Sequence, residues 1–181
     1  MTSVFKLIGG ALFGLAIAVP AQAQDPVKIG LVHGISGHAF EAFSKQAQTG
    51  FELGIEYATG GTNEIKGRPV ELVIKDSQFK PDVARAVLAE AYGDDEVLLA
   101  VGATSSGVTQ AMLPIAEEYE KILIVEPAVA DSITGENWNR YIFRTGRNSS
   151  QDAISNAVAL GGEGVTIATL AQDYAFGRDG V

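Results

Sequence analysis

"VLLAVGATSSGVTQAMLPIAEEYEKILIVEP", residues 97–127, contains a complete strand–helix–strand unit. It begins as an apolar strand, breaks at Gly102 into a small polar turn, continues as a helix with one apolar stripe and ends as a second apolar strand that stops at Pro127. Strands that are apolar along their whole length are typical of a parallel sheet that is covered on both faces. The stretch therefore predicts one unit of an α/β domain.

The same alternation extends in both directions from this unit. Upstream, the apolar periodicity predicts strands at residues 27–34 and 68–76, followed by helices at 39–58 and 81–92. Downstream, it predicts a strand at 140–146, a helix at 149–162 capped by Ser149 or Ser150, and a strand within 164–180 that leads into a loop and the start of a helix. Because Val181 falls within an element, we expect one full lobe, residues 24–147, and the incomplete start of a second, residues 148–181.

The first 23 residues have the pattern of a secretory signal peptide. Lys6 precedes an uncharged apolar run, and the A-x-A motif at residues 21–23 predicts cleavage after Ala23. The alternative, a membrane anchor, needs about 20 apolar residues, and the run is shorter than that. We therefore predict that the chain is exported, with residues 1–23 removed.

Composition excludes several classes of function. The chain has 13 basic and 22 acidic residues, a net charge of −9, which disfavours nucleic-acid binding. It contains no cysteine, no dinucleotide-binding fingerprint and no P-loop, and its two histidines, His33 and His38, lack the spacing of a metal site. We therefore expect neither a cofactor nor a metal.

The turn "TSSG", residues 104–107, allows three interpretations. It resembles the G-x-S-x-G motif of serine hydrolases, with Ala103 in place of the first glycine and Ser105 as nucleophile, but both histidines precede Ser105 and none follows it. In the second interpretation, Ser105 and Ser106 join the free N–H groups of the helix start to bind a carboxylate. In the third, Ser105 or Ser106 only caps its own helix.

The position of this turn supports a ligand site. In open α/β sheets, ligands bind outside the carboxyl ends of the strands. Four loops follow predicted strands there: "HGISGHAF" from residue 33, "DSQF" from 76, "ATSSG" from 103 and "EPAVA" from 126. We expect them to form one rim, at which Phe40, Phe43 and Phe79 favour a ligand with an aromatic or otherwise apolar body.

The order and spacing of "VKIGLVHGISG", "VELVIKDSQFKPDVA", the stretch quoted first, "YIFRTGRNSSQ" and "DYAFGRDG" resemble the amino-terminal lobe of the leucine/isoleucine/valine-binding protein family. These are periplasmic solute-binding subunits of branched-chain amino-acid-type ABC transporters. The resemblance implies a type I periplasmic binding protein with two three-layer lobes around a parallel sheet. The segment "RTGRNSSQDA" would be the first of three crossovers between the lobes.

The same resemblance implies a set of ligand-binding residues. Ser106, with Ser105 before it, falls on the carboxylate-binding serine, and Ala128 on the carbonyl that meets the ammonium. Phe43 lies near the aromatic residue that covers the ligand, and Tyr174 matches a tyrosine from the second lobe. Ala130 stands where the family has a threonine that contacts the head group; its missing hydroxyl removes about 1 kcal/mol.

The function implied by the resemblance is non-catalytic capture. A monomer would bind a branched-chain amino acid, an amide or related compound, or an aromatic acid, and would deliver it to the membrane permease of an ABC importer. Two alternatives stay open at this point: an exported serine hydrolase with Ser105 as nucleophile, and a ligand-sensing domain of the same fold.

Overall fold

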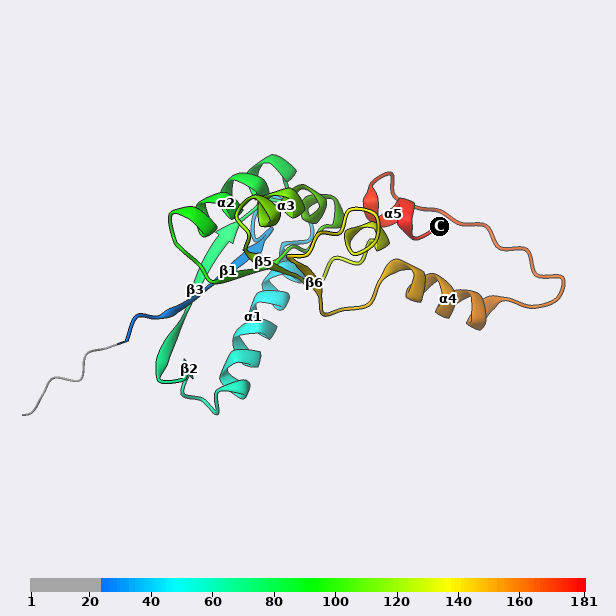
Figure 1. Cartoon of the computed structure of the whole chain (residues 1–181). Helices are drawn as coiled ribbons and strands as arrows, with labels where there is room; N and C mark the ends of the chain where they lie inside the picture. Colours follow the sequence, from blue (N-terminus) through cyan, green and yellow to red (C-terminus); the bar gives the residue numbers. More distant parts are fainter. Residues whose placement is uncertain (1–23) are drawn as a thin grey trace, which may run out of the picture.

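The computed structural model describes residues 24–181. The signal peptide predicted for residues 1–23 lies outside this range, so it stays a prediction. Strands and helices alternate along most of the described chain, as the hydrophobic periodicity predicts (Figure 1). Among residues 24–181, no helix has both the length and the apolar character needed to span a membrane.

Six strands form one sheet in the order β2-β3-β1-β4-β5-β6. All neighbours are parallel except β2 and β3, which are antiparallel. The longest pairing joins β1 to β3, from Val27 opposite Val70 to His33 opposite Asp76. The strand bounds are β1 (Val27–His33), β2 (Glu64–Ile65), β3 (Arg68–Asp76), β4 (Leu99–Gly102), β5 (Ile122–Val125) and β6 (Ile142–Arg144).

The helices are α1 (Glu41–Ala58), α2 (Pro81–Gly93), α3 (Ser106–Glu118), α4 (Ser149–Leu160) and α5 (Ala175–Asp179), with a 3₁₀ turn, η1 (Asp131–Ile133), after β5. The first three cover the two faces of the sheet. In Figure 1, α1 lies on one side of the sheet, and α2 and α3 lie side by side on the other. The predicted three-layer α/β lobe with a mainly parallel sheet is confirmed.

Two apolar cores follow from the alternation of side chains along the strands. On the α1 side, Leu31 and Val101 are buried against Phe51 and Ile55 of the helix. On the other side, Val32, Ala100 and Leu123 share a larger core with α2 and α3. Because both faces are buried, β4 is apolar along its whole length and β1 is apolar from Ile29 to Val32, which is the pattern that predicted them.

Two local predictions differ from the structure. Residues 165–170 form no strand and are exposed, because no neighbouring strand among the described residues offers them backbone hydrogen bonds. Helix α4 is capped by Asn148 rather than by Ser149 or Ser150: the Asn148 side chain accepts from the backbone N–H of Gln151, and the Gln151 side chain accepts from that of Asn148. This reciprocal pair is a capping box, which satisfies two free donors at once.

The end of the described chain packs against α3. In Figure 1, the segment between α4 and α5 runs away from the sheet, and α5 comes back next to α3. Asp179 of α5 accepts hydrogen bonds from the backbone N–H and the hydroxyl of Ser132 in η1, at 2.9 and 2.6 Å. Tyr174 is the N-cap residue of the same helix.

Candidate ligand-binding site

A cavity of about 610 Å³ opens at the carboxyl edge of the sheet. Its walls come from the loops after β1, β3, β4 and β5, which are the four segments that the strand order brings to one edge, and from residues around Tyr174. The expectation of a common rim is therefore confirmed. The cavity size is within the range usual for sites that enclose small molecules.

Aromatic rings dominate the lining. We define the aromatic wall as His38, Phe40 and Phe79, whose ring centroids lie 4.7–6.3 Å apart. Tyr174 and Phe176 form a second pair in the same lining, with centroids 5.9 Å apart. These separations are those of favourable aromatic contacts. The lining therefore offers several ring faces and edges to a bound molecule.

The polar part of the cavity is the turn before α3. Ser105 is the N-cap residue of this helix, with an extended backbone, yet its hydroxyl forms no capping hydrogen bond. Ser106 is buried, and its Oγ accepts a hydrogen bond from the backbone N–H of Ala130 at 3.3 Å. The first N–H groups of a helix have no partners within it, and its dipole is positive at that end. The arrangement suits a carboxylate.

The structure brings together five of the six residues singled out from the sequence. Phe43, Ser105, Ser106, Ala128 and Tyr174 all contribute to the lining of the cavity. Ala130 does not: it is fully buried behind the lining and contacts Ser106 through its backbone. Whether these residues bind a ligand stays a prediction.

Three polar side chains, from His33, Thr104 and Ser44, lie in a row at the turn. The Nδ1 atom of His33 lies 3.4 Å from the hydroxyl of Thr104, which in turn lies 2.6 Å from the hydroxyl of Ser44. His33 and Ser44 are almost completely buried, whereas Thr104 reaches the cavity. Burial lowers the pKa of His33 to about 4, so the imidazole is neutral near pH 7.

The histidines do not assemble a catalytic triad with Ser105. His33 contacts Thr104, and His38 accepts from the backbone N–H of Phe40 at 3.4 Å; neither is hydrogen-bonded to Ser105. A serine needs an adjacent base to act as a nucleophile. In the described part of the chain, no three or more His, Cys, Asp or Glu side chains form a group that could hold a metal ion.

Arg147 also lines the cavity and was not singled out from the sequence. It lies between β6 and α4, and its Nε donates to both carboxylate oxygens of Asp152, at 2.6 and 2.8 Å. Ligands bind outside the carboxyl ends of the strands, and this rule was applied to the loops after four predicted strands. The fifth predicted strand, "RYIFRTG", ends at the same edge, so the same rule applied there would have identified Arg147.

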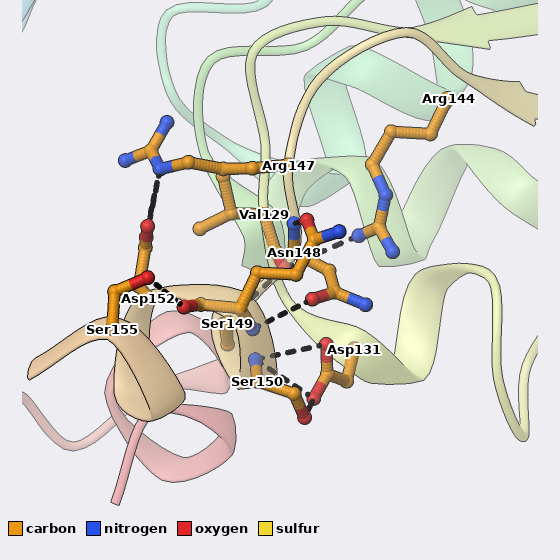
Figure 2. Close-up of polar contacts among 10 residues, drawn as sticks. Val129, Asp131, Arg144, Arg147, Asn148, Ser149, Ser150, Asp152 and Ser155 are labelled. Atoms are coloured by element: carbon orange, nitrogen blue, oxygen red, sulfur yellow. Dashed lines mark hydrogen bonds and ion pairs between the residues drawn. The ribbon is translucent and has the colours of Figure 1, made fainter. Parts of the chain in front are cut away.

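The segment that carries Arg147 is tied to the loop after β5 (Figure 2). Asp131 accepts hydrogen bonds from both the backbone N–H and the hydroxyl of Ser150. Arg144 donates to the backbone oxygens of Val129 and Ala130, at 3.2 and 2.8 Å. The loop that holds Ala128 and the start of α4 therefore form one hydrogen-bonded unit.

Comparison with known proteins agrees with this architecture. A family model described as periplasmic binding protein matches residues 26–181. A crystal structure of an ABC-type branched-chain amino acid transporter protein from Rhodopseudomonas palustris CGA009 is 64% identical, with a TM-score of 0.76 over 85% of this chain and 41% of that one. A solute-binding protein from R. palustris BisB5, solved with 3,4-dihydroxybenzoic acid, is 28% identical, with a TM-score of 0.76 over 87% and 42%.

A curated relative from Halobacterium salinarum, the chemotactic signal transduction system substrate-binding protein BasB, is 31% identical over 136 residues, which are 72% of this chain and 32% of the relative. The chain thus spans about a third to two fifths of the length of these proteins. The match of the family model over nearly all described residues, together with the fold and the cavity, shows that the chain belongs to the periplasmic binding protein family.

Proposed function

We propose that this protein is the substrate-binding component of an ABC importer, exported to the periplasm, which captures a small carboxylated ligand and delivers it to a membrane permease. The observation that carries the proposal is the cavity at the carboxyl edge, where the start of α3 presents Ser105 and Ser106. The Ser105 hydroxyl forms no bond to its own helix, so it is available as a donor to a ligand.

The ligand is held from two sides. Residues 24–147 form the first lobe, and residues 148–181 are the crossover and the start of the second. Phe43 belongs to the first lobe, Tyr174 follows the crossover, and both line the cavity. Closure of the two lobes on the ligand would bury its apolar body, and the closed form would dock on the permease. Capture needs no second copy of the chain, so the proposed state is a monomer.

The ligand class follows from the relatives and from the lining. The R. palustris CGA009 structure is that of a branched-chain amino acid transporter protein, and the BisB5 protein was solved with an aromatic acid. The proposed ligands are therefore branched-chain amino acids, related amides and aromatic acids. All are small molecules with a carboxyl-derived group and an apolar body, which fits a polar turn beside aromatic rings.

The proposed role is binding without catalysis. The family to which the chain belongs and the similar structures are solute-binding proteins. Ser105 lies at the start of a helix after a strand, but neither His33 nor His38 is hydrogen-bonded to it. A serine hydrolase built on Ser105 would need a base that these two residues do not provide.

A second candidate function is ligand sensing. It is favoured by the similarity to BasB, which is a substrate-binding protein of a chemotactic signal transduction system. The same cavity would bind the same ligand class, but the closed form would dock on a signalling partner. Capture on a purified permease, compared with capture on a purified receptor domain, distinguishes the two roles.

Calorimetric titration of the full-length protein with leucine, isoleucine and benzoate tests the main proposal. We expect saturable one-to-one binding of at least one of them and an increase in melting temperature, because a ligand that binds the native state stabilises it. Ester hydrolysis that depends on Ser105, without binding of any carboxylate, would contradict the proposal and support the hydrolase.

A further inference from the structure

The described lining of the cavity carries a positive charge and no negative one. Among the described residues of the lining there is no aspartate or glutamate, and Arg147 is the side chain with a permanent charge. A zwitterionic amino acid bound there would bring an ammonium group against a described lining that offers it only neutral acceptors. Two like charges repel more strongly where water is excluded, since the effective dielectric constant is lower.

The ion pair of Arg147 leaves part of its guanidinium group available. Asp152 occupies only the Nε side, and in Figure 2 the other two nitrogens lie on the side away from the Asp152 carboxylate. Both side chains are substantially exposed, at 61% and 39%, so the pair is a surface ion pair of modest strength. Arg147 therefore retains donors for a second anion.

Helix α4 holds Arg147 at the edge of the cavity. Asn148, the next residue, caps this helix through the reciprocal pair with Gln151, and Asp152 lies in the first turn of the same helix. Ser150 is bonded to Asp131, which fixes this turn to the loop after β5. The position of the guanidinium group is thus set by the crossover rather than by a free loop.

The apolar part of the cavity suits a flat ring better than a branched aliphatic chain. The aromatic wall of His38, Phe40 and Phe79 contributes three rings, and His38 is stacked on Phe40 with an interplanar angle of 25°. Aromatic ligands gain face and edge contacts with such rings in addition to the burial of apolar area. A leucine side chain gains the burial alone.

From these observations we infer that Arg147 makes the cavity selective for aromatic monocarboxylates that carry no ammonium group, and that the aromatic wall holds their ring. The inference rests on the proposed capture function and narrows it to one ligand class. It also assigns to the crossover a residue that determines specificity, because Arg147 lies outside the four loops after β1, β3, β4 and β5.

Two matched pairs of ligands test the inference on the full-length protein. 3-Phenylpropanoate differs from L-phenylalanine only by the ammonium group, and 4-methylpentanoate differs from L-leucine in the same way. By calorimetry we expect 3-phenylpropanoate to bind at least about tenfold more tightly than phenylalanine, because the ammonium group of phenylalanine loses its hydration beside the like charge of Arg147. We also expect it to bind more tightly than 4-methylpentanoate, because of its ring.

Substitutions at Arg147 test whether this residue causes the preference for ligands without an ammonium group. Arg147→Gln should reduce the affinity for 3-phenylpropanoate about tenfold and narrow its preference over phenylalanine. Arg147→Lys retains the charge and should keep most of that preference. Arg178→Gln is the matched control: Arg178 forms an exposed ion pair with Asp173, at 2.8 Å, and does not line the cavity, so neither affinity should change.

The inference and the proposed function fail in different ways. If phenylalanine or leucine binds more tightly than its partner without the ammonium group, or if Arg147→Gln keeps the full preference, the inference is wrong and the capture function stands. If the folded wild-type protein binds none of the four ligands, nor leucine, isoleucine or benzoate, both are wrong. Should Arg147→Gln fail to fold, the ligand pairs and Arg147→Lys still decide.

Discussion

The hydroxyl of Ser106 accepts a hydrogen bond from the backbone N–H of Ala130, 24 residues further along the chain, at 3.3 Å. Both residues are buried. The bond joins the start of α3 to the loop after β5, so the two loops that contribute Ser105 and Ala128 to the cavity are held together. Because the oxygen of Ser106 accepts, its proton is left to donate elsewhere.

Ser106→Ala should therefore lower both stability and affinity. The variant leaves the buried N–H of Ala130 without a partner, which costs about 1–3 kcal/mol of unfolding free energy. Chemical denaturation measures this cost, and calorimetry with a bound carboxylate measures the loss of affinity.

Ser105→Ala is the matched control for stability. Its hydroxyl makes no capping bond, so the unfolding free energy should change by less than the ~1 kcal/mol usual for loss of an N-cap. Its affinity for a carboxylate should nevertheless fall. Unchanged affinity in both variants would contradict the assignment of the carboxylate to this turn.

Because His33 is buried, we expect the unfolding free energy to decrease in mild acid. Burial lowers its pKa in the folded protein to about 4, below the ordinary value of 6.5. Between these values the unfolded state binds more protons than the folded state, so stability falls as the pH decreases from 6.5 towards 4. The full effect is about 3 kcal/mol.

Denaturation curves recorded across this pH range check the prediction. His33→Gln keeps a polar group near Thr104 but cannot be protonated, so it should flatten the pH dependence. His38→Gln, at an exposed position, serves as the control. An equal slope in the wild type and in His33→Gln would show that His33 is not the group responsible.

Gly34 allows the aromatic wall to form. A Cβ atom at this position would lie 2.3 Å from two ring atoms of Phe79. Gly34→Ala should therefore displace the Phe79 ring from His38, costing about 1–3 kcal/mol of stability through overpacking. It should also reduce the affinity for an aromatic carboxylate.

Gly50→Ala is the control for Gly34→Ala. Gly50 lies in α1 with open space around it, and alanine should stabilise the helix there by about 0.5–1 kcal/mol. Thermal denaturation and calorimetry of both variants provide the comparison. Wild-type affinity for an aromatic carboxylate in Gly34→Ala would show that Phe79 does not hold the ligand ring.

Asp131 should control how firmly the start of α4 is attached to the loop after β5. Asp131→Ala removes the acceptor for the N–H and hydroxyl of Ser150, so the backbone amide of Ser150 should exchange its hydrogen faster than in the wild type. The partly exposed site limits the loss of unfolding free energy to about 1–2 kcal/mol.

Hydrogen exchange of peptides that cover the start of α4, including Ser150, measures the effect of Asp131→Ala. Asp173→Ala, which removes a carboxylate that is 91% exposed from its pair with Arg178, should leave this exchange unchanged. Equal exchange in the wild type and in Asp131→Ala would show that other contacts hold the start of α4.

Much of the fold could be predicted from local patterns. The strand predicted at residues 68–76 coincides with β3, and the helix predicted at 81–92 ends one residue before α2 does. These elements have apolar residues at the period of their own structure, so each can be identified without its neighbours. The carboxyl-edge rule pointed to Ser105 and Ser106, and the family resemblance added Phe43, Ala128 and Tyr174; all five line one cavity.

What the sequence by itself determined about this protein is thus the type and order of most elements and the edge at which a ligand would bind, because periodicity and turn chemistry act between near neighbours. Only the tertiary structure decided which side chains share the cavity. Arg147 and Phe79 are far apart in sequence, Ala130 lies behind the lining although Ala128 does not, and residues 165–170 pair with no strand. Each of these facts depends on contacts between distant segments, which no local pattern records.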